Sequence, residues 1–231
     1  DLVLDVSKNV NPAVWDEGFF QEFFELLFGN RDYQKDGAEI ALRFLNSGEY
    51  KDITALAKEN FEKNEVIRAR WNNDFSKMQD DLESSDKLSA TLDLATGTGK
   101  SYVMFAIALI MLATKKVSRV LVLVPSRTIE RELTQKFKDL LENQQLLKTL
   151  GQNFVPPQIL NGDSTIVENS IAIENRDAIY KAQSSRNSII DSLRGNGEKT
   201  LVLNDEVHHV YYSESNEWKK FLEDERDNGI N

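Results

Sequence analysis

A glycine-rich loop stands between an expected strand and an expected helix. Residues 94–101 read Leu-Ala-Thr-Gly-Thr-Gly-Lys-Ser; the apolar run 88–94 predicts a strand, and the run 99–113 predicts a helix. Gly97 and Gly99 let the backbone curl so that successive N–H groups point inward, and the helix start adds the positive end of its dipole. Such a loop binds phosphate. The simpler alternative is an ordinary glycine-containing turn that opens a helix.

From residue 88 onward, expected strands alternate with expected helices, which is typical of a parallel sheet covered on both faces. After the loop, apolar segments predict strands at 119–124, 158–160, 170–173 and 200–204, and helices at 128–141 and 176–193. The chain is therefore expected to be an α/β protein.

A helical segment is expected before this α/β region. Aromatic residues at helical spacing predict a buried helix over 19–28, and a second helix follows over 32–45. The stretch 49–86 mixes charges with short apolar groups and predicts one or two exposed helices. We interpret about 46–86 as an insertion rather than a core element.

A second polar motif follows the last expected strand. Residues 200–209 read Thr-Leu-Val-Leu-Asn-Asp-Glu-Val-His-His, which puts two adjacent carboxylates at the carboxyl end of a buried strand, where ligands bind in open α/β sheets. Asp205 is placed to hold Mg²⁺, directly or through water, and Glu206 could polarise an attacking water. Alone, this motif is more often a solvated strand end. Together with a phosphate-binding loop it favours nucleotide hydrolysis, in which Lys100 would neutralise the β- and γ-phosphates and Ser101 would bind Mg²⁺.

Composition excludes several other classes of protein. The chain has no cysteine and two histidines, so a thiolate or imidazole metal centre is not expected. The net charge of −10 rules out nucleic-acid binding by bulk electrostatics, and only 115–148 is clearly basic. The longest apolar stretch, 103–113, is too short to span a bilayer, and the N-terminus lacks the basic start of a secretion signal. A cytoplasmic protein without membrane contact is expected.

The two motifs resemble motifs I and II of superfamily 2 helicases and translocases of the DExH type. They are most similar to the Res subunit of type III restriction enzymes, in which a large apolar residue precedes Ala-Thr-Gly-Thr-Gly-Lys and a second histidine follows the DExH box. Leu94 takes the place where the general phosphate-loop pattern has glycine, and Val207 stands where alanine is usual. The resemblance implies a RecA-like P-loop fold that uses ATP and Mg²⁺.

The resemblance also implies roles for individual residues. The implied catalytic residues are Lys100, Asp205, Glu206 and His208. The implied nucleotide-binding residues of the loop are Thr96, Gly97, Thr98, Gly99, Lys100 and Ser101, and the implied metal ligands are Ser101 and Asp205.

Three weaker matches extend the resemblance over most of 31–209. Arg-Asp-Tyr-Gln at 31–34 is similar to the Q motif, in which Arg31 and Gln34 would bind the nucleotide and the glutamine would read the adenine edge; a solvated helix start is the alternative. Val-Pro-Ser-Arg-Thr at 124–128 is similar to motif Ia, in which nucleic-acid phosphates are bound. The phosphate contacts implied there are Ser126, Arg127 and Thr128. Asn175 occupies the place of the next strand-binding motif, where a plain turn is equally plausible.

Some parts of such a motor are not found in this sequence. Motors of this superfamily bind ATP between two RecA-like domains, and the second domain supplies an arginine finger. Here 22 residues follow His209, with no candidate for motif III. We interpret 1–30 as an N-terminal helical segment and 31–231 as the first RecA-like domain of a longer protein, expected to hydrolyse ATP weakly alone. The two Glu-x-Lys tripeptides, at 49–51 and 217–219, are interpreted as surface charge rather than a nuclease.

The leading hypothesis is the first motor domain of an ATP-driven DNA translocase or helicase of a restriction system. Its expected partners are double-stranded DNA, a methyltransferase subunit and a second RecA-like domain. Two alternatives remain open. One is a nucleotide-binding or interaction module without turnover, and the other is an RNA helicase domain, which the variants at 94–101 and 205–209 disfavour.

Overall fold

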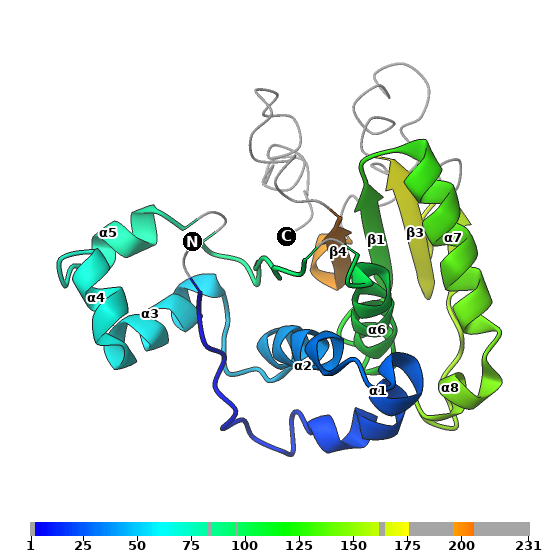
Figure 1. Cartoon of the computed structure of the whole chain (residues 1–231), viewed down its shortest axis with the longest axis horizontal. Coiled ribbons are helices and arrows are strands. Elements are labelled where there is room, and N and C mark those ends of the chain that lie inside the picture. The colour runs from blue at the N-terminus through cyan, green and yellow to red at the C-terminus, as the bar shows by residue number, and fades with distance from the viewer. Residues whose placement is uncertain (1–2, 83–84, 96, 162–164, 176–195, 206–231) are drawn as a thin grey trace.

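The described residues form a four-stranded, all-parallel sheet, which lies at the right in Figure 1. The computed structural model describes residues 3–82, 85–95, 97–161, 165–175 and 196–205. The strands are β1 (Arg119–Val124), β2 (Gln158–Asn161), β3 (Ser170–Asn175) and β4 (Thr200–Asn204). They lie in the order β2-β3-β1-β4, so the chain crosses over β1 between its third and fourth strands. All four predicted strands after residue 99 are confirmed, and β3 extends two residues further than predicted.

The central strand β1 is buried on both faces. Leu121 pairs in register with Ala172 of β3 and Val202 of β4, and its side chain is fully buried. Val120, Val122 and Val124 point to the face that carries the main core cluster. A strand covered on both sides has no need of polar alternation, which is why its sequence is a continuous run of Val and Leu.

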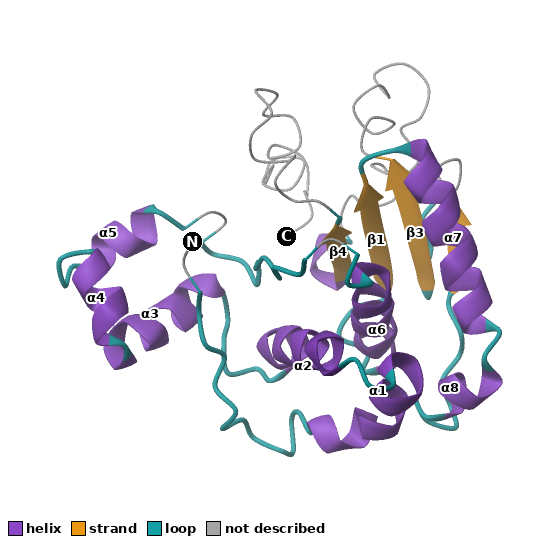
Figure 2. Ribbon diagram, in the orientation of Figure 1, coloured by secondary structure: helices purple, strands orange, loops and turns teal. Residues whose placement is uncertain are grey.

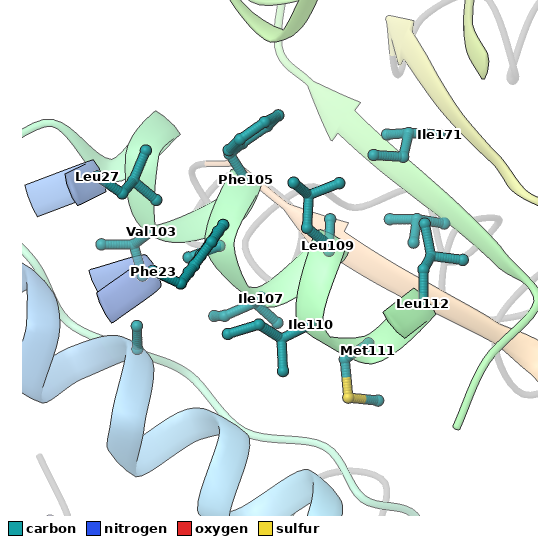
Figure 3. Close-up of a cluster of buried hydrophobic side chains, with 14 of the residues drawn as sticks. Phe23, Leu27, Val103, Phe105, Ile107, Leu109, Ile110, Met111, Leu112 and Ile171 are labelled. Atoms are coloured by element: carbon teal, nitrogen blue, oxygen red, sulfur yellow. The ribbon is translucent and has the colours of Figure 1, made fainter. Parts of the chain in front are cut away.

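Two helices pack side by side on that face of the sheet. They are α6 (Lys100–Ala113) and α7 (Arg127–Leu141), and the rings of Phe105 and Phe137 meet edge to face with centroids 5.1 Å apart. All residues from 105 to 112 of α6 are buried. A helix that is apolar all round must be covered all round. Figure 3 shows the reason for its burial, because Phe23 and Leu27 lie on one side of α6 and Ile171 on the other.

The helices that cover the outer side of α6 come from the N-terminal part of the chain. They are α1 (Gln21–Phe28) and α2 (Asp32–Asn46), as predicted for 19–28 and 32–45, and the 3-10 turn η1 (Glu17–Phe20) packs against α1. A short helix that was not predicted, α8 (Gln144–Lys148), follows α7. Since α1 contributes four buried side chains to the same cluster as α6, the N-terminal segment is part of the main core.

The described part of the charged stretch 49–86 contains three helices rather than the one or two predicted. They are α3 (Ile53–Lys63), α4 (Glu65–Arg70) and α5 (Phe75–Asp80), which extend to the left of the sheet in Figure 2. These helices are not simply exposed, because Ala57, Phe61, Ile67, Trp71 and Met78 form a buried cluster of their own, separate from the main core. The interpretation of about 46–86 as an insertion stays a prediction.

The predicted strand at 88–94 is not present, and this correction concerns the segment that leads into the glycine-rich loop. Residues 88–95 form no ladder with the sheet. Leu92 and Leu94 instead lie against Gly37 of α2, while Leu88 and Leu92 remain more than a third exposed. Alternating apolar residues can bury their apolar side against any apolar neighbour, whether or not they form a strand. Here that neighbour is α2 rather than the sheet.

Two further expectations concern the rest of the chain. The predicted helix 176–193 lies outside the described residues. In the part of the chain that the structure describes, none of the helices has the length and apolar character needed to cross a membrane.

Candidate nucleotide site

The glycine-rich loop leads directly into α6. Gly97 and Gly99 have φ of 80° and 79°, a left-handed conformation that glycine adopts without steric cost. Thr98 Oγ1 donates a hydrogen bond to the Ala95 carbonyl at 2.6 Å, which closes the turn. Gly99 is the N-cap of α6, so Lys100 and Ser101 lie in the first helical turn. Thr96 lies outside the described residues.

The loop and Asp205 lie at the same edge of the sheet. Only five residues separate the end of α6 at Ala113 from the start of β1, so α6 runs antiparallel to β1 and begins toward the carboxyl ends of the strands. Asp205 follows β4, and its N–H donates to the Leu123 carbonyl at 2.9 Å. This bond fixes the Asp205 backbone at the carboxyl ends of both β1 and β4. Glu206 and His208 lie outside the described residues.

The Ser101 hydroxyl has a cationic partner from another helix. Lys136 of α7 donates from Nζ to Ser101 Oγ at 2.6 Å, and the same ammonium lies 3.9 Å from the centroid of the Tyr102 ring. The Arg31 guanidinium also lies over this ring, 4.8 Å from its centroid. Both cations can be held by the negative face of the aromatic ring. Sequence reasoning missed Lys136 and Tyr102.

One sequence signal could have drawn attention to Lys136. The apolar face of α7 carries Leu133, Phe137 and Leu140, and Lys136 lies three residues after the first of these and four before the last. Residues at these spacings are neighbours on a helix, so Lys136 borders the face that packs inward. The sequence does not indicate, however, that α6 lies beside that face.

The start of α2 is attached to the loop. The Thr98 carbonyl accepts a hydrogen bond from the Tyr33 hydroxyl at 3.1 Å and another from Gln34 Nε2. Gln34 is completely buried, and its Oε1 has no hydrogen-bond partner among the described residues. A Cβ at position 99 would meet Gln34 Nε2, and the φ of 79° there also favours glycine. The structure thus places Gln34 on the loop backbone; its contact with adenine stays a prediction.

The Arg31 side chain forms hydrogen bonds to the C-terminal end of α1. Its Nε donates to the Phe28 carbonyl at 2.9 Å and its Nη2 to the Leu27 carbonyl at 3.3 Å. A guanidinium in this place satisfies the last carbonyls of α1, which have no partner within the helix. A nucleotide contact by Arg31 would therefore have to share this side chain with the end of α1.

The residues predicted to contact nucleic acid surround the start of α7. Ser126 is the N-cap of α7, and its Oγ accepts from the Ile129 N–H at 3.3 Å, while Arg127 and Thr128 are exposed. Asn175, at the end of β3, is buried, and its N–H donates to Glu130 of α7 at 3.2 Å. The structure brings these four residues to one end of α7.

The donor set suits a magnesium ion that is bound together with phosphates. Among the described residues, no group of three or more His, Cys, Asp and Glu side chains could hold a metal ion by itself. The Ser101 hydroxyl and the Asp205 carboxylate offer the hard oxygen ligands that Mg²⁺ prefers. Mg²⁺ commonly takes only one or two protein ligands and completes its shell with phosphate oxygens and water.

Comparison with known proteins supports one family. A family model described as "Type III restriction enzyme, res subunit" matches residues 30–228, most of the chain. No curated protein and no solved structure matches it. The matched range includes the glycine-rich loop, the start of α7 and the acidic motif.

Proposed function

Because the chain belongs to the family of type III restriction enzyme Res subunits, we propose that it couples ATP hydrolysis to movement along double-stranded DNA. The family is one of ATP-dependent, helicase-like motor domains, and the parallel sheet of this chain agrees with a RecA-like P-loop domain. The observation that carries the proposal is the placement of the loop and Asp205 at one sheet edge. We propose 31–231 as the first motor domain and 1–30 as its N-terminal helical segment.

The residues at this edge divide the chemistry among them. The curled backbone from Gly97 to Gly99 and the first turn of α6 would hold the phosphates, and Lys100 would neutralise their charge. Ser101 and Asp205 would hold Mg²⁺, which, when bound, neutralises charge on the β- and γ-phosphates. Glu206 would orient the attacking water, with His208 beside it.

The remaining assignments also belong to this proposal. Arg127 and Thr128 are exposed at the start of α7, in the only basic segment of the chain, and would contact DNA phosphates together with Ser126 and Asn175. A methyltransferase subunit and a second RecA-like domain are the expected partners, in the cytoplasm. Arg31 and Gln34 would contribute at the adenine side, and Thr96 and Thr98 at the phosphates.

The test is DNA-stimulated ATP hydrolysis by the full-length protein and its Lys100→Ala variant. Loss of a charge that stabilises the transferring phosphoryl group should lower kcat by about 10²-fold or more. Lys116→Ala is the matched control, because this exposed lysine follows the other end of α6. Retained DNA-stimulated turnover in Lys100→Ala would contradict the proposal. ATP binding without any turnover in the parent protein would favour the non-hydrolysing module instead.

A further inference from the structure

The contact between Lys136 and Ser101 joins two groups that the proposed chemistry would keep apart. Ser101 is the hydroxyl assigned to Mg²⁺, yet in the structure its oxygen accepts a hydrogen bond from an ammonium 2.6 Å away. Lys136 comes from α7, and Ser101 is in the first turn of α6.

The ammonium is held at this place by more than one contact. Its Nζ lies 3.9 Å from the centroid of the Tyr102 ring, and the aliphatic stem emerges beside Phe137, which is fully buried against Phe105. Among the described residues, no carboxylate forms an ion pair with Lys136. The hydroxyl and the aromatic face therefore hold the Lys136 ammonium in place, while no carboxylate among the described residues neutralises its charge.

A metal ion and this ammonium would both need a lone pair of the same oxygen. Mg²⁺ binds its oxygen ligands at about 2.0–2.1 Å and requires near-octahedral geometry, so it must point at a lone pair of Ser101 Oγ. An ammonium that donates to that oxygen also points at a lone pair. Two cations within a few ångströms of each other repel strongly, since their interaction is only partly screened in a half-buried site.

We propose that Lys136 and Mg²⁺ compete for the Ser101 hydroxyl, so that Lys136 raises the Mg²⁺ concentration at which the site binds a magnesium nucleotide. This inference rests on the proposed function. Lys136 is a positioning residue in this scheme, because it acts through Ser101 and leaves when the metal arrives. The competition weakens the binding of magnesium nucleotide and leaves the binding of metal-free nucleotide unchanged.

The experiment measures binding of a fluorescent, non-hydrolysable ATP analogue to the full-length protein at increasing Mg²⁺ concentrations. Lys136→Met removes the charge and keeps an apolar stem of similar length. The half-saturating Mg²⁺ concentration should fall about threefold to tenfold, the scale of losing one charge-assisted hydrogen bond in a half-exposed site. Affinity for the analogue in EDTA should stay within about twofold, and Lys136→Arg should behave like the parent protein.

Two controls separate this competition from other effects. Lys138→Met changes the same charge at an exposed position two residues further along α7 and should leave the Mg²⁺ requirement unchanged. In a Ser101→Ala background the effect of Lys136→Met should disappear, because the shared oxygen is gone. Thermal denaturation of each variant verifies that it is folded.

The outcomes distinguish failure of this inference from failure of the proposed function. Weaker binding in EDTA with an unchanged Mg²⁺ requirement would make Lys136 a phosphate ligand and overturn the competition. An unchanged requirement with unchanged affinity would overturn it as well. If the parent protein fails to bind the analogue, or if Lys100→Ala does not weaken binding, the proposed nucleotide site fails and the inference fails with it.

Discussion

Adjacent residues at the start of α7 differ in how much they contribute to the fold. Ser126 uses its hydroxyl to cap the helix, and Pro125 before it is half-buried, whereas the side chains of Arg127 and Thr128 are exposed. Replacing Ser126 by alanine would therefore remove a helix cap as well as any contact with DNA. Arg127 is the residue at which binding can be tested with the least effect on the fold.

Arg127→Ala is expected to weaken DNA binding about equally for all sequences. Phosphate contacts release counterions, so the slope of log affinity against log salt should decrease by roughly one unit. The measurement is a titration of fluorescent duplex DNA at several salt concentrations. Lys148→Ala, an equal charge change on α8, is the control. Identical affinities and slopes for Arg127→Ala and the parent protein would mean that this basic segment is only a solvated face.

Among the elements, α6 and α7 depend on each other for their position. The edge-to-face pair of Phe105 and Phe137 joins them one turn away from the contact between Ser101 and Lys136. Both phenylalanine side chains are fully buried in a close-packed core. If either ring were removed, neither water nor another side chain could fill its space without a rearrangement of the core. This pair holds the glycine-rich loop and the start of α7 in a fixed relation.

Phe137→Ala should lower the free energy of unfolding by about 3–5 kcal/mol, because it leaves a cavity in a close-packed core. Phe137→Leu should cost less, since it retains most of the apolar volume. Urea denaturation followed by circular dichroism measures both. Val66→Ala, at a position 79% exposed on α4, should change stability by less than about 0.5 kcal/mol. Equal effects at positions 66 and 137 would contradict the packing described for α7.

The elements differ in how well the sequence predicts them, for physical reasons. The bounds of β1 and β4 follow from their apolar runs, and β1, which is buried on both faces, has a continuous apolar sequence. The three helices of 49–86 could have been counted from their N-caps Asp52, Asn64 and Asp74, each of which accepts a backbone N–H. The segment 88–94 could not be assigned, since its partner, α2, is more than forty residues away.

The candidate site was predicted in its local parts and missed in its long-range contacts. The left-handed glycines and the helix start at Lys100 follow from the motif itself. The contacts of Thr98 with α2 and of Ser101 with α7 join residues 64 and 35 positions apart, respectively. No local pattern encodes such pairs, because they depend on which helices lie together.

In the molecule as a whole, the N-terminal segment binds the inserted helices to the rest of the chain. The Asp5 N–H donates to Asn60 of α3 at 2.8 Å, and the Ser7 N–H donates to the Tyr50 hydroxyl at 3.1 Å. That hydroxyl donates in turn to Glu59 at 2.5 Å. Burial and the hydrogen bond to Glu59 raise the pKa of Tyr50 to about 12. The insertion is thus fastened by the first residues of the chain as well as by the peptide bonds at its ends.

Tyr50→Phe should lower the free energy of unfolding at pH 7 by about 1–3 kcal/mol, because it removes a hydrogen bond to a carboxylate. The pKa of Tyr50 is raised on folding, so its contribution is fully present below pH 10 and is lost as the pH rises toward 12. The stability difference between parent and variant should therefore shrink over that interval. Urea denaturation at pH 7, 10 and 11.5 measures it. A difference that stays constant from pH 7 to 11.5 would contradict this role for the hydroxyl.

The continuity of α7 has a thermodynamic consequence. Arg127 and Lys136 are nine residues apart on α7, which corresponds to a rise of about 13 Å along the helix axis. Phe137, next to Lys136, is fully buried and anchors this part of the helix in the core. A ligand that moves α7 as a rigid body relative to α6 would also move the Lys136 ammonium relative to Ser101. Free-energy coupling between two binding events is reciprocal. If DNA binding eases the release of Lys136 from Ser101, DNA would strengthen the binding of magnesium nucleotide. Magnesium nucleotide would then strengthen the binding of DNA by the same factor. Through α7, each of the two ligands would then change the affinity for the other by an equal factor.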